Sequence, residues 1–308
     1  MPNWADILNE IQQFQASHFT QSNAAVDVVR RKYLKSLFDY TQRNVIAYYS
    51  GFLSKPGILQ ADINDEDKNG FMMAVHKLDR SKGLDLILHT PGGDIAATQS
   101  IVNYLQKMFK HNIRTIIPQI AMSAGTVIAC TCREIIMSNH SNIGPIDPHL
   151  SGVPAVGVIE EFRRACKEIK DDPSKIPIWQ SIIGQYRPTF LSRCENAIKW
   201  SNAFVQEQLE NVMFSGEPDA KNKSKNIVKK LTDYSKNKTH NRHIHFEECK
   251  KIGLKVTKIE DDNILQDLVL TVHHCYMYAL MNTPSYKMIE NHLGVALVKR
   301  EVAPQRQQ

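Results

Sequence analysis

The sequence lacks several features that would place it in other classes of protein. It has no run of about 18 apolar residues, the length that a membrane-spanning helix requires. No basic stretch followed by an apolar one comes after Met1, so no secretory signal peptide is predicted. Cysteine is scarce, with 6 in 308 residues, and none forms a C-x-x-C pair. These absences predict a cytoplasmic protein without a membrane anchor or a disulfide framework.

Repeats, low-complexity segments and a G-x-x-x-x-G-K-[ST] nucleotide loop are also missing. Any ATP-driven step would therefore need a partner protein. The net charge of +6 is modest, and the most basic stretch, 221–242, contains only Tyr234 as an aromatic residue. A solvated loop is expected there rather than a nucleic-acid arm. His240, His243 and His245 lie close together, but no cysteine or carboxylate completes a zinc-finger spacing. No metal or other cofactor is predicted.

Strand and helix patterns alternate between residues 84 and 148. Strands are predicted at 84–89, 113–118 and 134–137, with helices between them at 95–110 and 123–132. This order predicts βαβ units and a mainly parallel sheet, hence an α/β fold. A further strand is expected at 45–49, and the acidic segment 62–67 is predicted to open a helix over 65–79.

Both ends of the chain are predicted to be mostly helical. Helices are expected at 5–17 and 23–43, and beyond residue 150 at 157–171, 189–213, 222–232, 244–252 and 263–282. Three regions follow from this: an N-terminal helical extension (1–44), an α/β core (45–215) and a helical C-terminal region (216–308) that serves oligomerisation.

The first segment with chemical meaning is the sequence TPGG at 90–93, which ends a strand. Alone, Pro-Gly-Gly is an ordinary turn. Before a helix, however, Gly92 and Gly93 leave backbone N–H groups that a ligand can approach. Such amides stabilise the oxyanion of an acyl-transfer intermediate.

The second segment is AMSAGT at 121–126, where a strand turns into a helix. A lone serine there is usually an N-cap. Ser123 has small neighbours, Ala124 and Gly125, which let a substrate backbone approach. The two turns are one crossover apart, so both fall at the carboxyl end of the parallel strands, where open α/β sheets bind ligands. Together they predict a nucleophilic serine at an elbow-like turn.

These two segments and SNIGPIDP at 141–148 together resemble the Clp/signal-peptide-peptidase-A superfamily of serine peptidases, and most closely its serine dehydrogenase proteinase branch. The resemblance covers about residues 44–299. It implies a ClpP/crotonase-like spiral of βαβ units with helical additions at both ends. It further implies Ser123 as nucleophile, an oxyanion hole from the amides of Gly93 and Ala124, and ring-like homo-oligomers. Gly92 and Gly125 are then candidates for substrate binding.

The general base is where the sequence departs from the Clp pattern. The Clp histidine would fall at Ile146 or Asp147, and His149 follows shortly after. Asp147 is itself a further candidate, although its flanking prolines favour a turn. His240 is another candidate, because a remote histidine often meets the serine in space.

The signal-peptide-peptidase branch instead uses a lysine forty to fifty residues after the serine. A lysine base must be desolvated to be neutral. Lys167 and Lys170 lie on a charged helix face, whereas Lys175 lies between two prolines and is followed by apolar residues. Lys175 is therefore the favoured base, with His240 and His149 as alternatives.

A cytosolic serine endopeptidase acting on peptides or proteins is the function these residues favour. Two alternatives remain open. A crotonase-type acyl-CoA enzyme shares the oxyanion hole but does not require the serine, and a catalytically silent scaffold would explain the missing Clp histidine.

Overall fold

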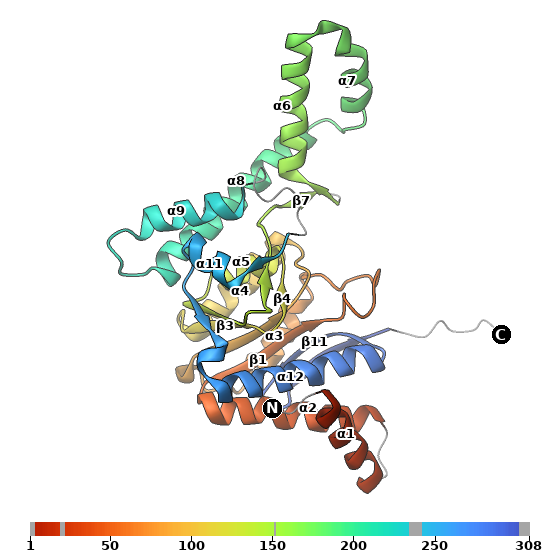
Figure 1. Ribbon diagram of the computed structural model, residues 1–308, viewed down its shortest axis with the longest axis vertical. Coiled ribbons are helices and arrows are strands. Elements are labelled where there is room, and N and C mark those ends of the chain that lie inside the picture. Colours follow the sequence, from red (N-terminus) through yellow and green to blue (C-terminus); the bar gives the residue numbers. More distant parts are fainter. Residues whose placement is uncertain (1–3, 19–21, 151, 234–241, 302–308) are drawn as a thin grey trace, which may run out of the picture.

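A seven-stranded sheet forms the centre of the computed structural model, which describes residues 4–18, 22–150, 152–233 and 242–301 (Figure 1). The strand order is β10-β5-β3-β2-β1-β11-β12. Neighbours from β10 to β1 are parallel, while β11 runs antiparallel to β1 and β12. The strands are β1 (Asn44–Ser50), β2 (Leu84–His89), β3 (Ile113–Ile117), β5 (Glu134–Met137), β10 (Val256–Lys258), β11 (Ser285–Asn291) and β12 (Ala296–Arg300). The predicted α/β class and mainly parallel sheet are confirmed.

Helices cover both faces of the sheet, as the alternating side chains of β1 show. Tyr49 packs with α1 (Trp4–His18), α2 (Ser22–Thr41) and α12 (Asn263–Asn282). Tyr48, on the opposite face, packs with α3 (Asp67–Val75), α4 (Ile95–Phe109) and α5 (Ala124–Cys130). Since both faces are covered, every residue of β1 is buried.

The helices beyond residue 150 leave the core and return to it (Figure 1). α6 (Ala155–Asp171), η2 (Pro173–Lys175) and α7 (Ile176–Ile183) form an arm that extends from the sheet. α8 (Phe190–Gln208) leads back through η3 (Leu209–Met213) to α9 (Ala220–Leu231) and α11 (Phe246–Ile252). The helices predicted in this part of the sequence are confirmed, with shifted ends. The remaining helical turns are η1 (Arg80–Lys82) and η4 (Ile259–Asp261).

Two small sheets lie above the carboxyl ends of the parallel strands. One consists of β4 (Ile120–Ala121), β6 (Asn142–Ile143) and β9 (Ile244–His245), and the other of β7 (His149–Leu150) and β8 (Val153–Pro154). Through β4 and β6 the chain stays close to the end of β2 before the arm begins.

The region from residue 216 on was predicted to be helical, but it also supplies β10, β11 and β12 to the main sheet. β11 was missed because Lys287 and Glu290 make its sequence look solvent-exposed, whereas both side chains are buried in ion pairs. Within the described segments, no helix combines the length and apolarity that crossing a bilayer requires.

Candidate active site

The two predicted turns meet at the carboxyl end of β2. Thr90 and Ala121 form an isolated parallel bridge. The Thr90 amide donates to the Ile120 carbonyl at 3.1 Å, and the Met122 amide donates to the Thr90 carbonyl at 3.0 Å. These bonds hold the glycine turn beside the turn that carries Ser123.

Ser123 has a strained backbone, with φ 51° and ψ −113°. Non-glycine residues rarely adopt this conformation, and it is known at the nucleophile elbow of hydrolases. Ser123 occupies the N-cap position of α5, yet its side chain makes no capping hydrogen bond. The Ser123 hydroxyl therefore does not cap the helix, which is the usual role of a serine at this position.

Gly92 and Gly93 are required by close backbone approach. A Cβ atom on Gly92 would lie 2.7 Å from Ser123 Cβ and 3.1 Å from the Ala124 nitrogen. A Cβ atom on Gly93, which has φ 154°, would lie 2.3 Å from both the nitrogen and the oxygen of Ile63. The glycine turn thus lies between Ser123 on one side and Ile63 on the other.

Two amides remain unused beside the serine. The Ile63 amide donates to the Gly92 carbonyl at 2.8 Å, and the Asp94 amide donates to the Ile63 carbonyl at 2.9 Å. The amides of Gly93 and Ala124, in contrast, donate to no acceptor within the described segments. They are available to a ligand that carries a developing negative charge.

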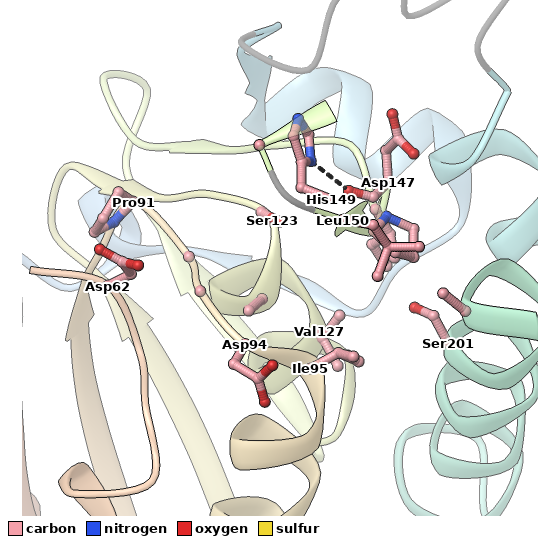
Figure 2. A pocket seen from close by; sticks show the side chains of 17 residues that line it. Asp62, Pro91, Asp94, Ile95, Ser123, Val127, Asp147, His149, Leu150 and Ser201 are labelled. Carbon is pink, nitrogen blue, oxygen red and sulfur yellow. Dashed lines mark hydrogen bonds between the residues drawn. The ribbon is translucent and has the colours of Figure 1, made fainter. Parts of the chain in front are cut away.

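Both turns line a cavity of about 450 Å³ (Figure 2). Ser123, Gly92, Gly93 and Ala124 form one wall, and the segment 146–150 forms another. Apolar side chains, including Val127, make up much of the lining. The cavity can hold a substrate side chain next to the serine hydroxyl.

His149, on β7, lines the same cavity and is exposed to solvent (Figure 2). Its Nδ1 lies 3.0 Å from the backbone carbonyl oxygen of Asp147. A carbonyl oxygen only accepts, so Nδ1 carries the proton of the neutral ring. Nε2 then presents a lone pair, which is what a general base needs.

Asp147 lies in the cavity wall with 6% of its surface exposed. Its Oδ1 accepts from the Val156 amide at 3.3 Å, while Oδ2 is buried without a hydrogen-bond partner in the described structure. Burial raises the pKa of this carboxyl, and the Val156 amide and His149 oppose that rise. Asp147 is thus a desolvated acid beside the histidine.

Ser201, on α8, is a cavity residue that sequence reasoning missed. Its hydroxyl is buried, and no partner for it is found among the described residues. It lies in the middle of a long helix, where no turn or motif marks it, and only the return of α8 to the core brings it to the cavity.

A lysine base would have to be desolvated and lie beside Ser123, and Lys175 meets neither condition. It lies in η2 on the arm and is not among the residues that line the cavity. Its Nζ pairs with Glu168 at 3.4 Å, and 42% of its side chain is exposed. A partly exposed, paired ammonium is not desolvated, so within one chain Lys175 is not placed to act as a base.

His240 lies outside the described residues. Gly125 is buried and does not line the cavity; a Cβ atom there would lie 2.6 Å from Thr90 Cγ2. The structure therefore gives Gly125 a packing contact against the Thr90 turn.

Several known proteins are similar to this chain. Residues 23–292 match the family model of the ClpP-like SDH-type serine proteinases. The uncharacterized protein MJ1495 of Methanocaldococcus jannaschii is 31% identical over 194 residues, which are 63% of this chain and 59% of that relative. The uncharacterized protein MJ0137 of the same organism is 30% identical over 206 residues, or 67% of this chain and 63% of that relative. The chain thus spans about three fifths of the length of these curated relatives.

Among solved structures, a variant of the 1510-N membrane-bound stomatin-specific protease has a TM-score of 0.40 and 18% identity. The match covers 67% of this chain and 79% of that one.

Proposed function

Because the chain belongs to the ClpP-like SDH-type serine proteinases, we propose that it is a serine endopeptidase whose nucleophile is Ser123. The observation that carries this proposal is the strained, uncapped Ser123 beside two unused backbone amides. Strain is retained at a site where it holds a functional group in place, and here it holds the hydroxyl at the mouth of the cavity.

The proposed reaction begins when Ser123 Oγ attacks the carbonyl carbon of a peptide bond. The Oγ–C bond forms, the hydroxyl proton passes to the base, and the carbonyl oxygen becomes an oxyanion. The amides of Gly93 and Ala124 donate to that oxygen. The C–N bond then breaks as the base returns its proton to the leaving amine. A water molecule releases the acyl group by the same steps in reverse roles.

We propose His149 as the base. Of the three predicted bases, it is the one that shares a cavity with Ser123 in the described structure, and its Nδ1 contact with the Asp147 carbonyl makes Nε2 the acceptor nitrogen of the neutral ring. Lys175 lacks the desolvation that a lysine base requires. His240 lies outside the described residues and stays a prediction.

Labelling with a fluorophosphonate tests the nucleophile. We expect the wild-type protein to gain one phosphonyl group, and mass spectrometry of the digest to place it on Ser123. Ser123→Ala is the control and should remain unlabelled. Labelling that persists in Ser123→Ala would refute the assignment, and an unlabelled wild type that is correctly folded would favour the silent scaffold.

The substrate is proposed to be a peptide or protein segment, because the cavity beside Ser123 is open to a side chain. We also propose that the protein is a cytoplasmic homo-oligomer. Its six cysteines are all free, which fits a reducing compartment. Ile176 and Ile178 on the arm are exposed, as residues of a subunit interface would be in a single chain.

A further inference from the structure

A buried ion pair lies behind the glycine turn, on the side away from Ser123. Lys287 Nζ lies 2.9 Å and 3.0 Å from the two carboxylate oxygens of Asp67. The side chains are 1% and 0% exposed. Replacing a buried ion pair by apolar residues often leaves the free energy of unfolding unchanged or raises it. A contribution to stability therefore does not explain why this pair is present.

The pair holds the backbone on both sides of Ile63. Lys287 Nζ also donates to the Asp62 carbonyl at 2.7 Å, and the Asn64 amide donates to Asp67 Oδ2 at 3.1 Å. Ile63 in turn bonds to the carbonyl of Gly92 and the amide of Asp94.

That contact determines how the Gly93 amide points. The Gly92 carbonyl and the Gly93 N–H belong to one planar, trans peptide, so they point in opposite directions. When the Ile63 amide binds the Gly92 carbonyl on one side, the Gly93 N–H is directed to the other side. Ile63 therefore acts on the amide that would hold the oxyanion.

A second route runs through two hydroxyl groups. The Tyr48 hydroxyl donates to Asp67 Oδ2 at 2.9 Å. Thr90 lies close enough to the Tyr48 phenol to oppose part of the rise that burial causes in the pKa of Tyr48, and Thr90 Oγ1 accepts from the Gly92 amide at 3.1 Å. Asp67 is thus linked to the Gly92 carbonyl through the backbone of Ile63, and the hydroxyl groups of Tyr48 and Thr90 lie between the same carboxylate and the Gly92 amide.

We propose that Lys287, Asp67 and Tyr48 form a positioning cluster that orients the Gly93 amide for the oxyanion of the reaction. The proposal rests on the proposed function of Ser123. None of the three residues touches the substrate. They act through Ile63 and Thr90, and they come from β11, α3 and β1.

The chain offers a matched control on the same strand. Glu290 is 0% exposed and pairs with Arg30 at 2.6 Å, so it is also a buried carboxylate facing a buried cation. Positions 287 and 290 lie on opposite faces of β11, and the contacts of Glu290 are with α2 and α12. Asp67→Asn and Glu290→Gln remove one buried charge each with little change of shape.

The test compares rate constants of fluorophosphonate labelling, well below the unfolding temperature of each variant. In this reaction the Ser123 Oγ–P bond forms, fluoride leaves, and the serine proton is released to the base. We expect Asp67→Asn to react about tenfold more slowly, a part of the roughly 100- to 1,000-fold that loss of an oxyanion donor costs. Glu290→Gln should react within about twofold of wild type. With a peptide substrate, Asp67→Asn should lower kcat and leave KM unchanged.

Tyr48→Phe removes only the hydroxyl group that donates to Asp67, and it serves as the test should Asp67→Asn fail to fold. We expect Tyr48→Phe to be labelled about threefold more slowly than wild type. Equal slowing in Asp67→Asn and Glu290→Gln, or no slowing in Asp67→Asn and Tyr48→Phe, would overturn the positioning role alone. A wild-type protein without label at Ser123 would overturn the proposed function, and the inference with it.

Discussion

At the scale of single residues, Ser123 shows how catalysis and stability oppose each other. Its φ of 51° and ψ of −113° suit glycine and cost other residues about 1–3 kcal/mol. The Thr90 turn lies so close to Ser123 that a Cβ atom on Gly92 would be 2.7 Å from Ser123 Cβ, which leaves this backbone little room to relax.

Replacing Ser123 should therefore separate strain from side-chain chemistry. We expect Ser123→Gly to be more stable than Ser123→Ala by about 1 kcal/mol or more, because only glycine adopts this backbone without strain. Both variants should be inactive. Thermal unfolding of the two proteins measures the difference, and a Ser123→Gly protein that is less stable than Ser123→Ala would show that the backbone is not strained there.

At the scale of elements, the question is which segment supplies the base. β7 brings His149 to the cavity, whereas η2 carries Lys175 on the arm. α6 packs against α8 around a small cluster of Ala155, Val158 and Cys194, which is separate from the two clusters that flank the main sheet. Contacts within the arm therefore hold Lys175 beside Glu168.

Substitution of each candidate distinguishes the two elements. His149→Ala should reduce peptide cleavage about as severely as Ser123→Ala, because the effects of replacing residues that act as one catalytic unit are not additive. Lys175→Ala should retain activity within a fewfold, since exposed ion pairs contribute about 0–1 kcal/mol. Steady-state kinetics on one peptide measures both. Severe loss in Lys175→Ala with an active His149→Ala would restore the lysine hypothesis.

At the scale of the whole molecule, buried histidines make stability depend on pH. His89 ends β2 directly before the Thr90 turn and is fully buried. Burial lowers its pKa from 6.5 to about 4, despite hydrogen bonds with the Gln119 side chain and the Ser50 carbonyl. The unfolded chain binds the proton first as pH falls, so stability decreases with falling pH between these two values.

The expected size of this effect is about 2 kcal/mol at pH 5 relative to pH 8. In His89→Gln, which has no ring to protonate, the free energy of unfolding should decrease less over the same interval. Urea unfolding at pH 5 and pH 8 measures the free energy of unfolding of both proteins. Equal pH dependence in wild type and variant would mean that His89 does not carry this linkage.

The sequence by itself determined the parallel core, most of the helices and the two turns that meet beside Ser123. These features depend on local properties: strand and helix periodicity, consecutive glycines, and a serine among small residues at a helix start. Such signals lie within a few residues of one another, so they can be read without knowing what packs against them.

Only the tertiary structure decided which distant residues surround the two turns. Ile63 lies in close backbone contact with Gly93, and Ser201 lines the cavity from α8. Lys287 lies behind Ile63 on β11, a strand that was not predicted because its charged residues suggested exposure to solvent. The prolines around Lys175 predicted a fixed, partly buried loop, and the structure places this lysine on the arm, outside the lining of the Ser123 cavity. Burial and pairing depend on contacts between segments far apart in the chain, and no local pattern encodes those contacts.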